Sequence, residues 1–85
     1  MYSLKIHKKA IKFLQSREAT ERRRIKQKLE LLKENPHSNT QLDIKKLKGE
    51  EELFRLRIGK IRIIYKIIEG ELIILIITAG VRGDV

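Results

Sequence analysis

The chain contains no cysteine and a single proline in 85 residues. Without cysteine it forms neither disulfides nor thiolate metal sites, and two histidines, His7 and His37, cannot supply the four ligands of a structural zinc. Its longest apolar run, residues 72–77, is too short to span a bilayer. The start of the chain lacks the apolar segment of a signal peptide. We therefore expect a cytoplasmic protein with no metal, no cofactor and no membrane attachment.

Positive charge is what the chain has in excess. Lys and Arg number 20 against 11 Asp and Glu, a net charge of +9. With 41% hydrophobic residues the chain has enough apolar surface for a core, so it is not a disordered basic tail. Its length allows one domain, residues 1–85. The charge favours a polyanionic partner, with nucleic acid first and an acidic protein second, and solubility is the plain alternative.

Hydropathy patterns predict two helices in the first half of the chain. Residues 2–7 alternate as a half-buried strand does. From Lys8 apolar residues recur at helical spacing, and Ser16 or Thr20 is expected to end this helix and cap the next. A second helix over about 19–34 ends before the single proline, because a residue that precedes proline avoids the helical region.

The last third of the chain predicts an antiparallel sheet. Three strand-like runs, 53–58, 61–68 and 71–78, are separated by the turns Gly59-Lys60 and Glu69-Gly70, and a short strand is possible near 44–47. The later two runs are apolar on both faces, so we expect central strands buried on both sides. The fold class is therefore α+β, in the order β-α-α-β-β-β, with a helical hairpin on one face. A partner, or a segment missing from the chain, is expected to cover the other face.

The segment 53–68 holds five basic residues and no acid. Arg55 and Arg57 are two residues apart on one strand and so share a face. Arg62 lies across the hairpin, and Arg82 follows the last strand. Four guanidiniums on one face would make a phosphate site, because arginine binds phosphate oxygens bidentately and stays charged. A solvated basic strand pair is an equal alternative.

Other candidate residues favour ordinary roles. His7 and His37 are more typical of surface residues than of general acids or bases. Tyr2 and Tyr65 fit inward strand positions better than base stacking. The basic helix face over residues 22–28 could contact an RNA backbone, and a solvated helix face is at least as good an interpretation.

Four sequence segments are typical of one protein family. They are Leu47-Lys48-Gly49, Phe54-Arg55-Leu56-Arg57-Ile58-Gly59, Ile61-Arg62-Ile63-Ile64-Tyr65 and Gly80-Val81-Arg82-Gly83-Asp84-Val85. Together with the order of elements they resemble the RelE/ParE superfamily of toxins from toxin–antitoxin systems, over essentially the whole chain. RelE-type members cut mRNA in the ribosomal A site, whereas ParE-type members poison DNA gyrase. The resemblance implies a toxin and leaves both targets open.

If the chain is RelE-like, the resemblance implies roles for its arginines. RelE-type toxins cleave RNA without a metal, by attack of a 2′-OH on the adjacent phosphate. Arg62 matches the arginine that contacts the scissile phosphate, and Arg82 matches the one that stabilises transition-state charge or protonates the leaving group. Both are therefore implied as catalytic. Arg55 and Arg57 match positions that are often lysine, and because arginine is too basic to act as a general base, an electrostatic, RNA-binding role remains.

Three lysines complete the implied RNA-binding surface. Lys46 and Lys48 match a basic loop that approaches rRNA or mRNA, and Lys60 lies in the turn between the two arginine-bearing strands. The family also implies an acidic antitoxin that wraps the toxin and complements its charge of +9. Family members commonly continue past this chain's last four residues with a tyrosine and a short helix. Since the chain ends at Val85, we expect a shortened member with weak or absent activity.

Two other functions are compatible with these residues. A ParE-like protein would inhibit gyrase without a nuclease centre, and a plain RNA-binding module would hold structured RNA on its basic face. The pair Arg62 and Arg82 favours the RelE-like interpretation, because a gyrase binder does not need it. We predict a ribosome-dependent endoribonuclease (an mRNA interferase) that inhibits translation, with the ribosome, mRNA and an antitoxin as partners.

Overall fold

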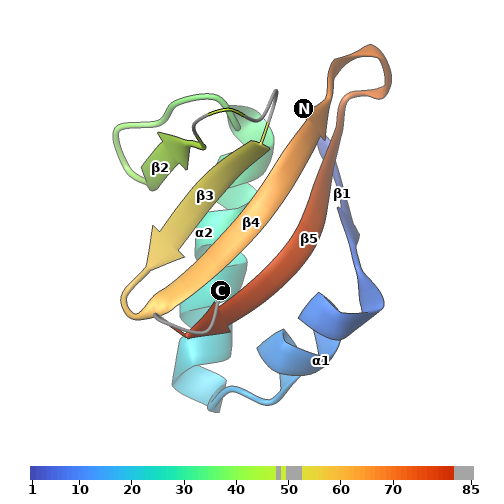
Figure 1. Cartoon of the computed structure of the whole chain (residues 1–85). Helices are drawn as coiled ribbons and strands as arrows, with labels where there is room; N and C mark the ends of the chain where they lie inside the picture. Colours follow the sequence, from blue (N-terminus) through green and yellow to red (C-terminus); the bar gives the residue numbers. More distant parts are fainter. Residues whose placement is uncertain (48, 50–52, 82–85) are drawn as a thin grey trace.

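The computed structural model describes residues 1–47, 49 and 53–81 of the chain. Its elements are β1 (Ser3–Ile6), α1 (Lys8–Gln15), α2 (Ala19–Glu34), β2 (Asp43–Lys46), β3 (Leu53–Ile58), β4 (Ile61–Ile68), the 3₁₀ turn η1 (Glu69–Glu71) and β5 (Ile73–Val81). The strands form one sheet in the order β1-β5-β4-β3-β2 (Figure 1). This confirms the predicted α+β class, and the short strand that seemed possible near 44–47 is present as β2.

The sheet is mixed rather than wholly antiparallel. β2, β3, β4 and β5 pair antiparallel in sequence, whereas β1 pairs parallel with β5. Tight turns set the direction of the hairpin strands and can be recognised locally. Two helices separate β1 from the rest, so no local signal fixes its direction.

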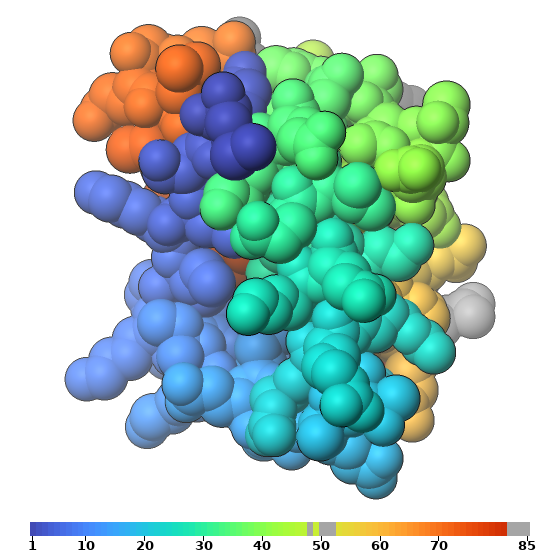
Figure 2. Space-filling view, turned by 180° about the vertical axis from the view of Figure 1, so that it is seen from behind, coloured from blue at the N-terminus to red at the C-terminus, as the bar shows by residue number. Residues whose placement is uncertain are grey.

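Both helices lie on one face of the sheet, which we call the helix face. In Figure 1 α2 runs behind β3 and β4, and from behind the segment from the N-terminus through α2 covers most of the view (Figure 2). Neither α1 nor α2 combines the length and apolarity needed to cross a membrane.

The hydrophobic core fills the space between the sheet and the helices. The strands contribute Phe54, Leu56, Ile58, Ile61, Ile63, Tyr65, Ile67, Ile74 and Ile76, and the helices contribute Ala10, Ile25, Leu29 and Leu32, all buried. The predicted inward position of Tyr65 is confirmed, and its hydroxyl donates a hydrogen bond to the carbonyl of buried Pro36 over 2.6 Å. Burial raises the pKa of the Tyr65 phenol.

The opposite side of the sheet, the open face, is only half covered. Ile64, Ile68, Ile73 and Leu75 alternate with the core residues and are half-buried, and Ile77 is 38% exposed. Both strands are central as predicted but are buried on the helix face alone within the described part of the chain, so cover of the open face by a partner or a missing segment stays a prediction. Helices pack on one face only, so isoleucine on the other face stays in partial contact with water.

Two turns differ in how well their sequence predicted them. Gly59 has a φ of +60° in the β3–β4 turn, as the Gly59-Lys60 spacing indicates. Between β4 and β5 the chain makes a 3₁₀ turn, and Leu72 then takes a left-handed conformation with a φ of 53°. This connection is longer than the predicted Glu69-Gly70 turn, so β5 begins at Ile73 rather than at residue 71.

A β-bulge interrupts the β4–β5 ladder. Ile64 pairs with Thr78, and the next residue, Tyr65, pairs with Ile76, so β5 carries one extra residue, Ile77. Strand side chains alternate between faces, and the extra residue reverses that alternation beyond it. Gly80 therefore lies on the open face as the register partner of Arg62, and Ala79 packs toward the core.

The helix bounds were predicted well, and Ser16 ends α1 as expected, whereas the N-caps of both helices differ from the prediction. His7 caps α1, because its Nδ1 accepts a hydrogen bond from the Lys9 amide over 3.2 Å. The residue that precedes α2 is Glu18, whose side chain makes no capping hydrogen bond, so neither Ser16 nor Thr20 caps it.

Candidate nucleic-acid interface

Three of the four predicted guanidiniums meet on the open face. Arg57 on β3 is the register partner of Arg62 on β4, and Arg55 pairs with Ile64 beside them. Residues directly opposite on antiparallel strands have Cβ atoms about 5 Å apart. Arg55, Arg57 and Arg62 form what we call the arginine cluster. The predicted Arg82 lies outside the described residues.

Asp43 is a member of this site that the sequence did not reveal. It is the register partner of Arg57 on the neighbouring strand β2. Its Oδ1 accepts a hydrogen bond from Arg55 Nη2 over 3.0 Å, and its Oδ2 lies 2.7 Å from Arg57 Nη2. One carboxylate thus orients two guanidiniums and neutralises one of their charges. The sequence would have indicated Asp43 only if the strand over residues 43–46 had been aligned in register with β3.

Arg62 is the member of the arginine cluster that forms no ion pair among the described residues. Its Nε is buried, as is that of Arg55, and within the described part of the chain neither atom has a hydrogen-bond acceptor. A buried donor without an acceptor costs on the order of 1–3 kcal/mol, and more when the group is charged. An anion that entered the open face would supply acceptors to both.

The lysines predicted to bind RNA are dispersed. Lys46 is the register partner of Phe54 and so sits at the edge of the helix face, away from the arginine cluster. Lys45, which pairs with Arg55, takes the position on the open face. Lys60 is exposed in the β3–β4 turn, next to the arginine cluster in sequence. Lys48 lies outside the described residues.

Both histidines lie apart from the arginine cluster. His7 caps α1, and His37 Nε2 lies 3.0 Å from Glu69 Oε1, which also accepts a hydrogen bond from the Tyr2 hydroxyl over 3.1 Å. Desolvation, then the hydrogen bond to Glu69 and its charge, raise the pKa of Tyr2. Within the described residues no three His, Asp or Glu side chains gather as a metal site would require.

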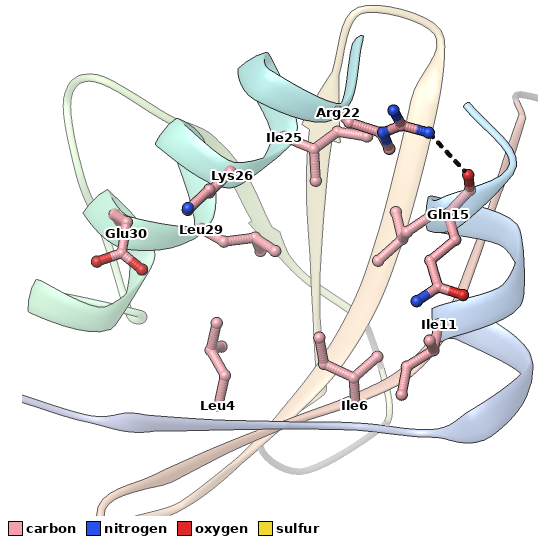
Figure 3. A pocket seen from close by; sticks show the side chains of 10 residues that line it. Leu4, Ile6, Ile11, Gln15, Arg22, Ile25, Lys26, Leu29 and Glu30 are labelled. Atoms are coloured by element: carbon pink, nitrogen blue, oxygen red, sulfur yellow. Dashed lines mark hydrogen bonds between the residues drawn. The ribbon is translucent and has the colours of Figure 1, made fainter. Parts of the chain in front are cut away.

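An apolar groove lies on the helix face, between β1, α1 and α2 (Figure 3). It encloses about 290 Å³ and is lined by the apolar side chains of Leu4, Ile6, Ile11, Leu14, Ile25 and Leu29. Polar side chains form its rim: Gln15, Arg22, Lys26 and Glu30. Arg22 Nη1 donates to the Gln15 carbonyl over 3.2 Å, which ties α2 to the end of α1.

Comparison with known proteins identifies the family. Residues 4–83 match the model of the ParE toxin of the type II toxin-antitoxin system, parDE. A protein of Methanocaldococcus jannaschii that carries the provisional name toxin RelE1 is 37% identical over 75 residues, which are 88% of this chain and 83% of that protein. The chain belongs to the ParE/RelE toxin family. The resemblance inferred from its motifs is thereby confirmed.

Solved structures of RelE toxins share the fold of this toxin. The toxin in the archaeal RelE-RelB complex from Pyrococcus horikoshii is 32% identical, with a TM-score of 0.84 over 99% of this chain and 98% of that chain. The isolated Escherichia coli RelE toxin is 23% identical, with a TM-score of 0.82 over 95% of this chain and 84% of that chain, a likeness of fold alone. The toxin is therefore RelE-like in its fold and family.

Proposed function

We propose that this toxin is a ribosome-dependent endoribonuclease that cuts mRNA in the A site and so inhibits translation. The observation that carries the proposal is the pair of buried Nε donors, on Arg55 and Arg62, that have no acceptor among the described residues. A phosphate bound on the open face would accept from both. Arginine binds phosphate through parallel N–H···O hydrogen bonds, which are stronger when both groups are charged.

The arginine cluster supports cleavage by attack of the substrate's own 2′-OH. The 2′ oxygen forms a bond to the adjacent phosphorus as it loses its proton, and the 5′ oxygen leaves and gains one. Negative charge builds on the non-bridging oxygens during this step, and fixed guanidiniums stabilise it more strongly than water does. Arg62, which no described carboxylate neutralises, is proposed as the principal catalytic residue, and Arg82 as the second on the basis of the family motif.

We also propose an acidic antitoxin as the protein partner and the cytoplasm as the compartment. The Pyrococcus horikoshii relative was solved as a RelE-RelB complex. The apolar groove with its charged rim suits an amphipathic helix, and a net charge of +9 suits an acidic chain. The half-covered isoleucines of the open face offer a second apolar surface to such a partner.

Gyrase inhibition is the second candidate function, because the matching family model describes the ParE toxin. A gyrase inhibitor acts by binding alone, so it does not need the buried Nε donors of Arg55 and Arg62. The two functions therefore make different predictions for Arg62. A nuclease needs Arg62 for its cleavage rate even at saturating toxin, whereas a gyrase inhibitor does not.

The deciding experiment compares cleavage of a defined mRNA on purified ribosomes by the wild-type chain and Arg62→Ala, at saturating toxin. We expect Arg62→Ala to lower the cleavage rate about 100-fold or more, as loss of one fixed transition-state donor does. Arg23→Ala, which removes an exposed arginine from α2, is the matched control and should leave the rate within about 3-fold.

Supercoiling by purified gyrase is measured with the wild-type chain, Arg62→Ala and Arg23→Ala. Inhibition of gyrase together with intact mRNA on ribosomes would overturn the nuclease proposal in favour of the ParE-like function. Equal cleavage by the wild type and Arg62→Ala would also overturn it.

A further inference from the structure

A basic notch lies around the sheet edge from the arginine cluster, between α2 and the β2–β3 pair. It encloses about 500 Å³, and its polar lining comes from Arg24, Lys28, Gln41, Asp43, Arg57 and Gly59. Arg57 belongs both to the notch and to the arginine cluster. The two basic surfaces are thus continuous around the edge of the sheet.

Of the two helix cations of the notch, Lys28 is hydrogen-bonded to a backbone carbonyl and Arg24 lies against a turn. Arg24 and Lys28 are four residues apart on α2 and so lie on one face of the helix. Arg24 Nη1 lies 3.4 Å from the point where a Cβ on Gly59 would stand, so its guanidinium rests against the β3–β4 turn. Lys28 Nζ donates to the Gln41 carbonyl over 3.3 Å.

Positive charge exceeds negative charge in the notch. Three cations line it, Arg24, Lys28 and Arg57, against one carboxylate, Asp43. That carboxylate is already engaged by two guanidiniums, Arg55 and Arg57. Within the described residues neither Arg24 nor Lys28 forms an ion pair. The notch is therefore a positively charged site, and the carboxylates among the described residues do not neutralise its charge.

We propose that the notch binds a backbone phosphate of an RNA strand, next along the strand from the phosphate held by the arginine cluster. A guanidinium and an ammonium that share one cavity suit a phosphodiester, which accepts hydrogen bonds from both. An acidic amphipathic helix is a poorer occupant, because it needs an apolar surface, and the notch is mainly polar where the groove of Figure 3 is apolar. The geometry of the notch favours a phosphate, and the choice of RNA as the molecule that carries it rests on the proposed function.

The test measures binding of a fluorescent single-stranded RNA that is 2′-O-methylated throughout and so cannot be cleaved. The full chain is compared with Arg24→Gln/Lys28→Gln and with the control Arg23→Gln/Lys26→Gln. Both variants change two exposed or half-exposed positions of α2 and lower the net charge from +9 to +7. We expect the notch variant to lose about 10-fold in affinity, and its slope of log affinity against log salt to fall by about 0.7, the value for one phosphate contact on a single strand. The control should lose less than about 3-fold.

Several outcomes would overturn the proposal. Equal losses in the two variants would show that net charge alone attracts RNA. A notch variant that loses binding of inorganic phosphate, followed by amide NMR shifts, while RNA affinity holds, would make the notch a free-anion site. Loss of binding to a polyglutamate peptide with unchanged RNA affinity would assign the notch to an acidic protein.

Folding and nuclease activity are kept separate from this result. Equal thermal midpoints by circular dichroism are required of both variants, and Arg24→Lys, which keeps the charge and loses the planar fork, serves as a second variant with an expected intermediate loss. Because the RNA is uncleavable and Arg62 is intact, the notch-specific loss supports the proposal even if Arg62→Ala leaves mRNA cleavage unchanged. Such a pair of results would overturn only the nuclease.

Discussion

On strand β3, Phe54, Leu56 and Ile58 face the helices and are buried, while Arg55 and Arg57 alternate with them on the open face. The helix face is a dry core of isoleucine, leucine and aromatic side chains. The open face of the same strands carries guanidiniums, a carboxylate and isoleucines half in water. Successive side chains of a strand point to opposite faces of the sheet, so residues that stabilise the core alternate with residues that can bind a ligand. A substitution on the helix face should therefore change the free energy of unfolding, and a substitution of the next residue, on the open face, should change that free energy less and can change ligand binding.

The largest effect on stability is expected at Ile63, which is fully buried on the helix face. Ile63→Ala should lower the free energy of unfolding by about 2–5 kcal/mol, because it removes buried methyl groups and leaves a cavity. Ile64→Ala, one residue on and half-buried on the open face, should cost less than half of that. Urea unfolding of both variants gives the comparison, and equal losses would mean that the open face is also a core.

A smaller effect is expected at Tyr65, at the boundary between the core and the loop. Tyr65→Phe leaves the Pro36 carbonyl without its donor and should cost about 1–3 kcal/mol at pH 7. Burial raises the pKa of Tyr65 above its ordinary value of 10.0, so its protonated form is favoured in the folded state. Its contribution is complete below pH 10 and is lost as the pH rises from there toward the folded pKa.

Alkaline unfolding tests this sign. The wild type should lose stability between about pH 9.5 and 11 more steeply than Tyr65→Phe does. Tyr2→Phe is the comparison variant: the pKa of that phenol is also raised, but it lies at the half-exposed Glu69 contact, so its removal should flatten the decline less than the removal of Tyr65. A parallel decline in wild type and Tyr65→Phe would contradict the role assigned to burial.

The smallest change in stability, and a gain in binding, is expected at Asp43 on the open face. Asp43→Asn removes two ion pairs that share a carboxylate 42% exposed to solvent, so stability should fall by less than about 1 kcal/mol. It also releases Arg55 and Arg57 toward phosphate, so affinity for uncleavable RNA should rise about 3-fold to 10-fold. Glu34→Gln makes the same change in net charge on the far end of α2. A rise of equal size in Glu34→Gln would assign the gain to net charge alone.

The parts of the fold that the sequence predicted are those fixed by local periodicity. Helical spacing and the single proline gave the bounds of α1 and α2, and Gly59 marked the β3–β4 turn. The shared face of Arg55 and Arg57 follows from strand alternation, and the hairpin turn then brings Arg62 opposite them. These features depend on residues close together in the chain.

The missed features depend on pairing between distant segments. The strand was expected near 44–47, and the family resemblance implied Lys46 as its RNA-binding lysine. In the observed register Lys45 and Asp43 are on the arginine side, and Lys46 is not. The approach of Arg24 to Gly59 joins a helix to a turn more than thirty residues away, and no sequence pattern indicates it.

The bulge at Ile77 sets which residues of β5 lie beside the arginines. Before the bulge the even-numbered residues of β5 face the core, and after it the odd-numbered residues do. If β5 continued from Ile76 without the bulge, Ile77 would lie opposite Ile64 and Ala79 opposite Arg62, and Thr78 would turn toward the core. The one extra residue therefore places Gly80, which has no side chain, rather than Ala79 beside Arg62, and so leaves room for a ligand at that guanidinium.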